Sequence, residues 1–264
     1  PLLAALGGLP PETQETVVGI LAAIPYKSSL PYLYDLRASS KNAGVRAAAE
    51  KAIVQLDGAY NPGVTAASLY EALGEAYYAG LESLTSFPRE SMQLLWSYNP
   101  SSGLVATNID TRVFNEAMAM RMAEKALSLD AAANRSLSLW LAANFSREID
   151  QPKDYSNPAY GPDRRDAMYY AVAAGPGSAQ AVLGRALDRR DTPLARRAIA
   201  AIERTAGATA LTGGDSARRP LLEALRYPNR RVQYEAALAL AVSQPGSSFE
   251  GAERGVRILG SAIR

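Results

Sequence analysis

The sequence predicts an all-α protein that carries one small β-hairpin. Of the 264 residues, 48% are hydrophobic and 20% are charged, so the chain has enough apolar material for one continuous core. Apolar residues recur at helical spacing along most of the chain, while cap-forming side chains and prolines precede these segments and glycines follow them. The segments measure about 10 to 18 residues, an ordinary length for globular helices, and about ten to twelve of them are expected.

The first long helix is expected from about Glu12 to Ala23. Pro10 and Pro11 precede it, an acidic side chain lies in its first turn, and Pro25 ends it. Side chains that can cap the free amides of a first turn mark the later helix starts. These residues are Asn42, Thr65, Asp110, Asp130, Asp163, Thr192 and Asn229, and glycines predict helix ends at Gly80, Gly175 and Gly207.

A different pattern predicts the hairpin, near residues 92–108. Trp96 and Tyr98 stand in an apolar segment, Asn99 to Gly103 supplies turn residues, and a second apolar segment follows. The two aromatic side chains either pack as a plug on the helices or bind a partner. A second irregular stretch, 149–162, contains several prolines and is expected to be an ordered loop.

One pattern occurs three times, in residues 42–53, 191–202 and 229–240. Each copy has a capping residue, an apolar residue and then alanines along one face, and each follows another apolar helix. The equivalent positions are Val45, Leu194 and Val232; Ala49, Ala198 and Ala236; Ala52, Ala201 and Ala239; and Ile53, Ile202 and Leu240. The pattern resembles the second helix of a HEAT repeat, in which small side chains let neighbouring helices approach closely. As a whole, the chain is similar to bacterial HEAT-repeat proteins.

The middle of the chain resembles another repeat. Residues 70–77 read Tyr-Glu-Ala-Leu-Gly-Glu-Ala-Tyr, which is similar to the first helix of a tetratricopeptide repeat (TPR). Ala119, Ala123 and Ala126 are spaced like the second helix of that repeat, after an insertion that contains the hairpin. The insertion is expected either to cover the groove of the repeat or to bind a partner itself.

Both resemblances imply the same architecture. A single helix pair cannot bury its apolar face, so neighbouring pairs stack into a right-handed superhelix, or α-solenoid, with a concave face. We expect HEAT-like repeats in residues 1–63, TPR-like helix pairs with the inserted hairpin in 64–150, and further HEAT-like repeats in 151–264. Because the sequence begins at Pro1 and ends inside an expected helix at Arg264, we also expect it to be a piece of a longer chain.

HEAT and TPR families mostly act as scaffolds, so the resemblance implies a non-enzymatic module that binds a protein or peptide partner on its concave face. The sequence contains no His and no Cys, which excludes thiol nucleophiles, Ser-His-Asp triads, disulfides and ordinary zinc sites. Carboxylates at helical spacing, such as Asp163 with Asp166 and Glu71 with Glu75, are interpreted as solvated helix charges. We therefore expect no cofactor, no metal and no enzymatic activity.

The sequence leaves the compartment open. No apolar run reaches the roughly 18 residues needed to cross a bilayer, so a soluble protein without a membrane span is expected. A chain without cysteine suits reducing and oxidising surroundings alike. The cytoplasm and the periplasm of a bacterium are both compatible with this composition.

Charge is unevenly distributed along the chain. Residues 1–150 hold 11 Lys and Arg against 15 Asp and Glu, whereas residues 151–264 hold 17 against 11, and 16 of those 17 are Arg. Arginine favours planar contacts with carboxylate or phosphate, so the partner could be acidic. The alternative to a protein partner is nucleic acid or another polyanion, which a ridge of arginine pairs would bind as in HEAT-like DNA glycosylases. Acidic residues near these pairs favour local ion pairs over that alternative.

Tyrosine is the dominant aromatic residue, with 14 Tyr against 4 Phe and 2 Trp. Adjacent helical residues point about 100° apart, so one member of each doubled tyrosine is expected in the core and the other on a groove. Tyrosine suits interfaces because it buries area and keeps a polar tip. We predict partner contacts by Tyr77, Tyr78, Tyr169 and Tyr170 as anchors and by Arg196, Arg197, Arg230 and Arg231 as readers of charge.

Overall fold

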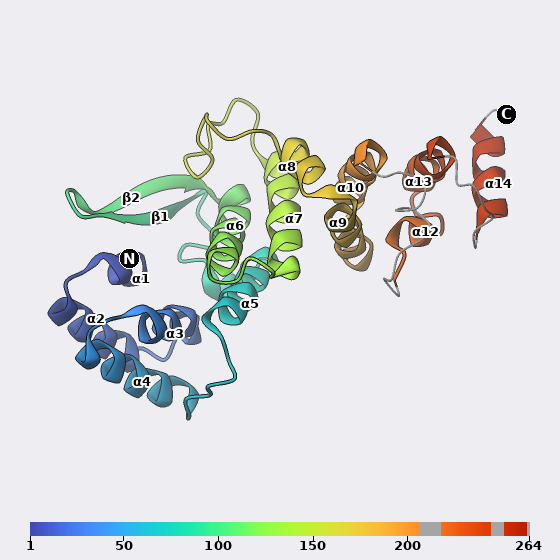
Figure 1. Ribbon diagram of the computed structural model, residues 1–264. Coiled ribbons are helices and arrows are strands. Elements are labelled where there is room, and N and C mark those ends of the chain that lie inside the picture. Colours follow the sequence, from blue (N-terminus) through green and yellow to red (C-terminus); the bar gives the residue numbers. More distant parts are fainter. Residues whose placement is uncertain (206–217, 244–250, 263–264) are drawn as a thin grey trace. The chain divides into compact units, whose positions relative to one another are not determined.

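The computed structural model describes residues 1–205, 218–243 and 251–262 (Figure 1). Within these ranges the chain is mostly helical, with thirteen α-helices and one two-stranded antiparallel sheet. A helical fold with a β-hairpin is therefore confirmed. The helix end predicted at Gly207 lies outside the described residues. None of the helices in these ranges is long and apolar enough to cross a membrane.

The chain forms two compact units, which we describe separately. Unit 1 comprises residues 1–136 and 152–161, and unit 2 comprises residues 137–151 and 162–264. Helix α7 (Asn134–Asp150) begins in unit 1 and continues in unit 2. The stretch that follows α7 has no helix or strand before Ala167, as its prolines predict.

Unit 1 consists of six helices, three short 3-10 turns and the hairpin. In chain order these are α1 (Leu2–Ala5), η1 (Leu6–Gly8), α2 (Pro11–Ala23), η2 (Lys27–Ser29), α3 (Leu30–Ser39), α4 (Ala43–Asp57), α5 (Ala66–Tyr78), η3 (Glu82–Leu84), β1 (Met92–Asn99), β2 (Gly103–Asp110) and α6 (Thr111–Leu129), before the first turn of α7. The helix predicted from Glu12 to Ala23 is α2 and begins one residue earlier, at Pro11.

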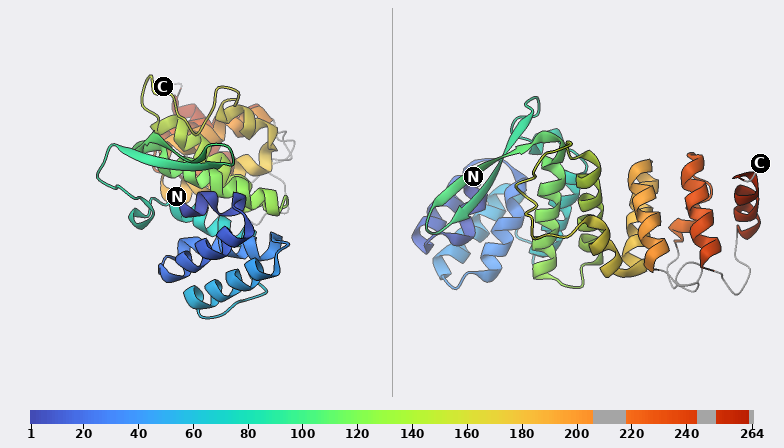
Figure 2. Two further views of the ribbon diagram at one scale, coloured as in Figure 1. Left: turned by 90° about the vertical axis from the view of Figure 1, so that its left-hand side faces the viewer. Right: turned by 90° about the horizontal axis from the view of Figure 1, so that it is seen from above.

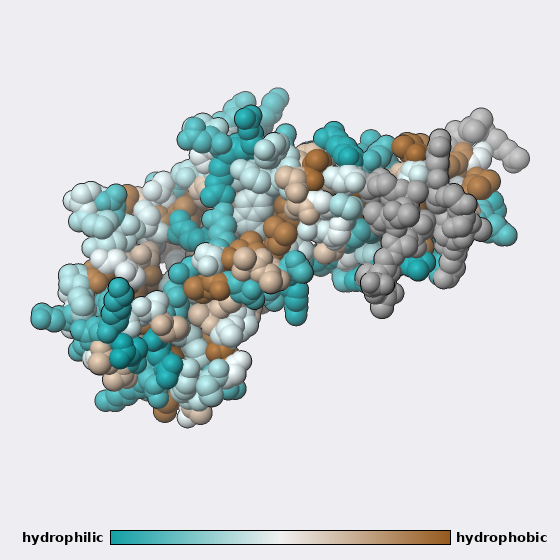
Figure 3. All heavy atoms as spheres, viewed as in Figure 1, coloured by the Kyte–Doolittle hydropathy of each residue, from teal (hydrophilic) through white to brown (hydrophobic). Residues whose placement is uncertain are grey.

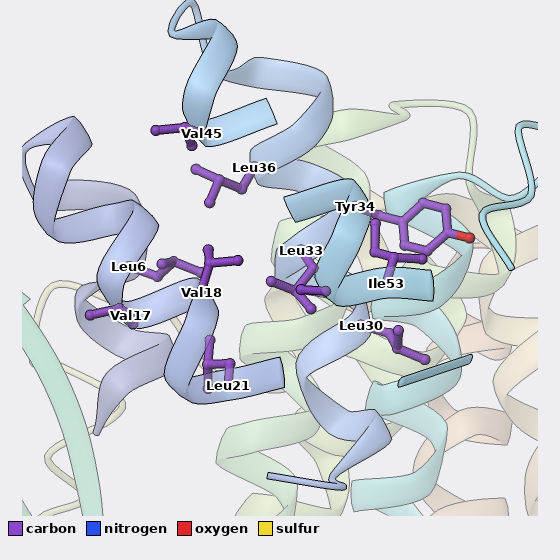
Figure 4. Packing of buried hydrophobic residues seen from close by; sticks show 11 residues of the cluster. Leu6, Val17, Val18, Leu21, Leu30, Leu33, Tyr34, Leu36, Val45 and Ile53 are labelled. Carbon is purple, nitrogen blue, oxygen red and sulfur yellow. The ribbon is translucent and has the colours of Figure 1, made fainter. Parts of the chain in front are cut away.

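The core of the N-terminal helices lies between α2, α3 and α4 (Figure 4). Val18 from α2, Leu33 from α3 and Ile53 from α4 point toward one another there, and each is at most 1% exposed. The repeat positions Val45 and Ala52 belong to the same cluster. The apolar face predicted from the first copy of the HEAT-like pattern is therefore the buried face of α4.

Asn42 caps α4 as predicted, because its side-chain oxygen accepts a hydrogen bond from the Val45 N–H at 3.1 Å. The substitution Asn42→Ala is expected to lower the free energy of unfolding of unit 1 by about 1 kcal/mol, since it removes this acceptor. Urea unfolding followed by Trp96 fluorescence in a Trp140→Phe background measures the change. The exposed neighbour Lys41 provides the control, Lys41→Ala, and equal midpoints for the two variants would contradict the prediction.

The hairpin forms where the sequence predicts it. The two strands pair from Met92 with Asp110 to Asn99 with Gly103, and Gly103 adopts the positive φ of 73° that the turn requires. Figures 1 and 2 show the hairpin beside the N-terminal α1, which contacts both strands. On its other side, Leu95 and Ile109 are buried against α6.

Helices α5 and α6 pack together across the insertion, as expected of two halves of one helix pair. Tyr70 and Leu73 of α5 share a buried cluster with Met122 and Ala126 of α6. The face of unit 1 visible in Figure 3 carries small hydrophobic groups interspersed with hydrophilic side chains.

Unit 2 is described as the rest of α7 followed by six helices. These are α8 (Ala167–Ala173), α9 (Gly175–Arg189), α10 (Thr192–Thr205), α12 (Pro220–Ala224), α13 (Arg230–Val242) and α14 (Ala252–Ala262). Helix α9 packs on α10, α10 on α13, and α13 on α14. The repeat positions of α10 and α13 are buried, as in α4. They are Leu194, Ala198, Ala201 and Ile202 in α10, and Val232, Ala236, Ala239 and Leu240 in α13.

Two of the predicted helix starts are wrong. Asp130 follows the end of α6, and α7 begins only at Asn134. Asp163 is not a helix cap. The apolar segment of α8 begins directly after Asp166, and the Asp166 carboxylate accepts the hydrogen bond from the Tyr169 N–H. The predicted caps Thr65, Asp110 and Asn229 do accept backbone hydrogen bonds at the first turns of α5, α6 and α13. Helix α10 begins at Thr192 as predicted, but its cap is Asp191, which accepts from the Leu194 N–H.

Candidate functional site

Unit 1 contains a cavity of about 650 Å³, which we call the aromatic pocket. Side chains of α1, α3, α5, β1 and α6 line it, so segments far apart in the sequence build its wall. Five of the lining residues are aromatic, and they come from four elements. They are Tyr32, Tyr70, Tyr77, Trp96 and Phe114.

The aromatic rings of the pocket contact one another edge to face. The Tyr32 and Tyr70 centroids lie 5.1 Å apart with an angle of 73° between the rings, and the Tyr77 and Phe114 centroids lie 6.3 Å apart at 80°. Such arrangements place the positive edge of one ring on the negative face of the other. The rings therefore support each other in fixed positions before any ligand binds.

Three charged side chains line the pocket. Lys125 Nζ lies 2.8 Å from Asp35 Oδ2, so these two charges form an ion pair. Arg121 Nη1 donates to the main-chain oxygen of Trp96 at 2.8 Å. Within the described part of the chain, Arg121 forms this hydrogen bond and no ion pair. The charged groups that line the pocket thus leave one positive charge uncompensated.

The backbone of β1 explains why a side chain of α6 reaches the hairpin here. The Ser91 carbonyl accepts a hydrogen bond from the N–H of Thr111, the residue opposite it. In an antiparallel pair every second residue forms such backbone bonds, so the odd-numbered residues of β1 are hydrogen-bonded to β2. Even-numbered residues, including Trp96, therefore direct their N–H and C=O groups away from β2. The outer edge of β1 thus faces Arg121 and the pocket.

Burial raises the pKa of Tyr32, Tyr70 and Tyr77 above the ordinary value for tyrosine. The charge of Arg121 acts in the opposite direction and lowers the pKa of Tyr32 and Tyr77, although burial dominates. Because an unperturbed tyrosine already has a pKa near 10, all three hydroxyls are protonated at neutral pH. They can donate hydrogen bonds but are poor bases and poor nucleophiles.

The N-terminal wall of the pocket is formed by α1 and η1. The Tyr98 ring lies so close to Gly8 that a Cβ atom at position 8 would come within 2.5 Å of it. Gln14 Nε2 donates to the Leu6 main-chain oxygen at 3.0 Å, which ties α2 to the same turn. The hairpin is thus anchored on both α6 and the N-terminal turn, so it is a structural plug and also a wall of the pocket.

Comparison with family models, with curated proteins and with solved structures finds no match to this chain. The resemblance to HEAT and TPR families therefore stays a prediction from the sequence. Among the residues that the structure describes, no cluster of acidic side chains is arranged to hold a metal ion. The chemistry of the pocket has to be inferred from its own geometry.

The predicted tyrosines lie in different places. Tyr77 is half-buried and lines the aromatic pocket, whereas Tyr78 is buried, with 8% of its surface exposed. In unit 2, Tyr169 is 57% exposed and Tyr170 is half-buried, with its ring centroid 5.0 Å from that of Trp140. The first pair thus has one core member and one pocket member, but Tyr170 of the second pair is not in the core, and Tyr78 is too buried to be the partner anchor that was predicted.

The predicted arginines all belong to unit 2 and mostly contact neighbouring side chains. Arg196 and Arg231 both pair with Glu235, and Arg230 donates to the Tyr234 hydroxyl at 2.9 Å. Arg197 is exposed, and with Arg196 it lines a second cavity of about 660 Å³. This cavity is also lined by Glu148, Glu203 and Glu235, so it carries acidic and basic groups together.

Sequence reasoning missed Tyr32, Arg121 and the pocket itself. The local signal at Arg121 is its place between Met120 and Met122 on α6. Glu124 and Lys125 follow on the same helix, so this position alone does not identify a partner for Arg121. The partner of Arg121 depends on where β1 lies in the fold, and local sequence patterns do not predict that placement.

Proposed function

We propose that this chain is a non-enzymatic protein-interaction module that binds a partner protein by taking one of its apolar side chains into the aromatic pocket. The aromatic pocket is the observation that carries the proposal. Its volume of about 650 Å³ lies within the range of about 300 to 1,000 Å³ that is usual for ligand sites. Its lining combines aromatic surface with a few polar groups, which is the composition of such sites.

The helix pairs fit the same proposal. We retain the HEAT-like α-solenoid with TPR-like central pairs as the proposed architecture, with a partner on its concave face. The equivalent repeat positions of α4, α10 and α13 are buried, which supports this interpretation. Several of these positions are alanines, whose small side chains allow neighbouring helices to pack closely. Proteins of this architecture mostly bind other macromolecules, but fold alone does not establish an activity.

The polar groups of the pocket favour binding over catalysis. Asp35 is the carboxylate among the lining residues, and it is already paired with Lys125 at 2.8 Å. The tyrosine hydroxyls are held protonated by burial. These groups can orient a ligand, but none of them is poised to take a proton from it or to attack it.

The alternative function, polyanion binding, is not favoured by the contacts of unit 2. Arg218 pairs with both Asp188 and Glu223, and Glu235 serves two arginines of α10 and α13. Phosphate groups would have to compete with these carboxylates. We therefore propose a protein partner and no nucleic acid.

Selection from random peptide libraries, presented either in a constrained loop or at a free C terminus, tests the proposal on the full chain. We expect enriched peptides to carry an aromatic or large aliphatic residue. Their affinity should fall about tenfold or more when Trp96→Ala removes a wall of the pocket. Circular dichroism checks that the variant remains folded.

The exposed Tyr169 of unit 2 provides the matched control, because it was predicted as an anchor and lies outside the pocket. Tyr169→Ala should leave the affinity unchanged. Failure to enrich any peptide would overturn the proposed function. Loss of affinity in Tyr169→Ala with none in Trp96→Ala would instead place the binding site at the tyrosines of unit 2.

A further inference from the structure

The aromatic pocket offers several hydrogen-bond donors and one positive charge without a counter-ion among the described residues. The hydroxyls of Tyr32, Tyr70 and Tyr77 are protonated, and Arg121 has several N–H groups but no lone pair to offer. The carboxylate among the lining residues, Asp35, is already engaged by Lys125. Gln14 and four serines also line the pocket and can accept as well as donate, so the feature that selects a ligand is the positive charge of Arg121.

Arg121 is the strongest of these donors and is held in place. Its hydrogen bond to the Trp96 carbonyl uses Nη1 and fixes the guanidinium at the outer edge of β1. A guanidinium carries five N–H groups in a planar fork, so further donors remain after this bond is formed. Since Arg121 forms no ion pair with the described residues, its positive charge is free to attract an anion.

The backbone of an internal peptide segment is neutral, so it brings no negative charge to Arg121. The last residue of a chain is different. Its carboxylate is an acceptor with two oxygens, which matches the fork of an arginine, and its side chain begins one bond away. One terminal residue can thus present an anion and an apolar group to the same pocket.

We infer that the aromatic pocket binds the C-terminal residue of the partner protein, with its carboxylate at Arg121 and its apolar side chain among the rings of Tyr32, Tyr77 and Phe114. This inference rests on the proposed function and names the part of the partner that is recognised. The charge of Arg121 acts on the hydroxyls of Tyr32 and Tyr77, so both lie in its neighbourhood; the Tyr32 hydroxyl now donates to Met122 Sδ at 3.6 Å, a weak bond that a carboxylate can replace. Backbone capture of a free chain end is a known mode of peptide recognition, and here a side chain supplies the charge.

The test uses peptides enriched from the free C-terminus library, synthesised as the acid and as the C-terminal amide. The amide removes the charge and keeps the size. We expect the amide to bind the wild-type chain about tenfold or more weakly, because it loses a charge-assisted pair of hydrogen bonds. In Arg121→Gln, acid and amide should bind equally. In the control Lys51→Gln, which removes an exposed charge elsewhere in unit 1, the preference for the acid should persist.

The outcomes separate this inference from the proposed function. Equal binding of acid and amide to the wild-type chain, with the Trp96→Ala effect retained, would overturn the inference and leave the function standing. A preference for the acid that survives in Arg121→Gln would also overturn it. If 3-phenylpropionate, an aromatic acid without a peptide, binds as tightly as the peptide acid, the ligand is a free acid and not a chain end. If no peptide binds at all, the proposed function itself fails.

Discussion

Replacement of Tyr70 by alanine is expected to lower the free energy of unfolding of unit 1 by about 3 to 5 kcal/mol. Tyr70 is 2% exposed and lies on α5 at the junction with α3 and α6. It packs against Met122 and Ala126 of α6, and its ring meets the Tyr32 ring edge to face. Alanine removes the contacts that hold these three helices together.

The measurement can be confined to unit 1, because the chain has two tryptophans, Trp96 in unit 1 and Trp140 in unit 2. Urea unfolding followed by fluorescence in a Trp140→Phe background reports on Trp96 alone. Tyr26→Ala is the control, since Tyr26 is 69% exposed and should change stability by no more than about 0.5 kcal/mol. Equal unfolding midpoints for Tyr70→Ala and Tyr26→Ala would contradict the prediction.

The substitution Tyr70→Phe distinguishes packing from hydrogen bonding. Phenylalanine keeps the ring and its edge-to-face contact, so stability should fall by only about 1 kcal/mol or less. A loss as large as that of Tyr70→Ala would mean that the hydroxyl, and not the ring, stabilises the junction. Because Tyr70 also lines the pocket, this variant tests its hydroxyl as a donor without removing the wall.

Local features of this fold follow from the sequence, because short-range chemistry determines them. Asn42 and Asn229 lie directly before apolar helical segments, and each side chain accepts a backbone hydrogen bond there. The hairpin follows from alternating apolar residues and the turn at Asn99 to Gly103. Where two caps compete, as at Asp163 and Asp166, the residue nearest the apolar segment is the one that caps.

The pocket could not be predicted, because it depends on the placement of segments far apart in sequence. Tyr32, Trp96 and Arg121 come from α3, β1 and α6, and no spacing rule relates them. The TPR-like pattern did mark Tyr70 and Tyr77, which belong to this site, but it gave no reason to join them to the hairpin. The direction of the outer edge of β1, which brings Arg121 to Trp96, follows only from the strand register.

Replacement of Arg147 by methionine is expected to lower the free energy of unfolding of unit 2 by about 3 to 5 kcal/mol, because it breaks a buried ion pair. The Arg147 side chain is 7% exposed and lies on α7. Its guanidinium donates to Asn144 Oδ1 at 3.0 Å and lies 3.3 Å from Glu148 Oε1. A third bond goes to Gln151 Oε1 at 3.2 Å, and methionine, although it fills much of the same volume, leaves all three acceptors without this donor.

The loss of the Arg147 guanidinium also affects α8, because Glu148 contacts the start of that helix. The same Oε1 atom accepts from the Ala167 N–H at 2.7 Å, so the Glu148 carboxylate holds the first residue of α8. Without Arg147, a carboxylate that is 22% exposed loses its counter-charge, and its remaining hydrogen bond compensates only part of the desolvation cost. We therefore expect the start of α8 to loosen as well.

A double variant distinguishes the loss of charge pairing from the loss of packing. Arg147→Met with Glu148→Gln removes both charges, so it should be more stable than Arg147→Met alone if the uncompensated carboxylate causes the damage. Trp140 fluorescence in a Trp96→Phe background reports on unit 2, and Arg197→Met, on an exposed arginine of α10, is the control. If single and double variants unfold at the same urea concentration, the cost arises from packing and from the hydrogen bonds to Asn144 and Gln151, and the charge of Glu148 contributes little.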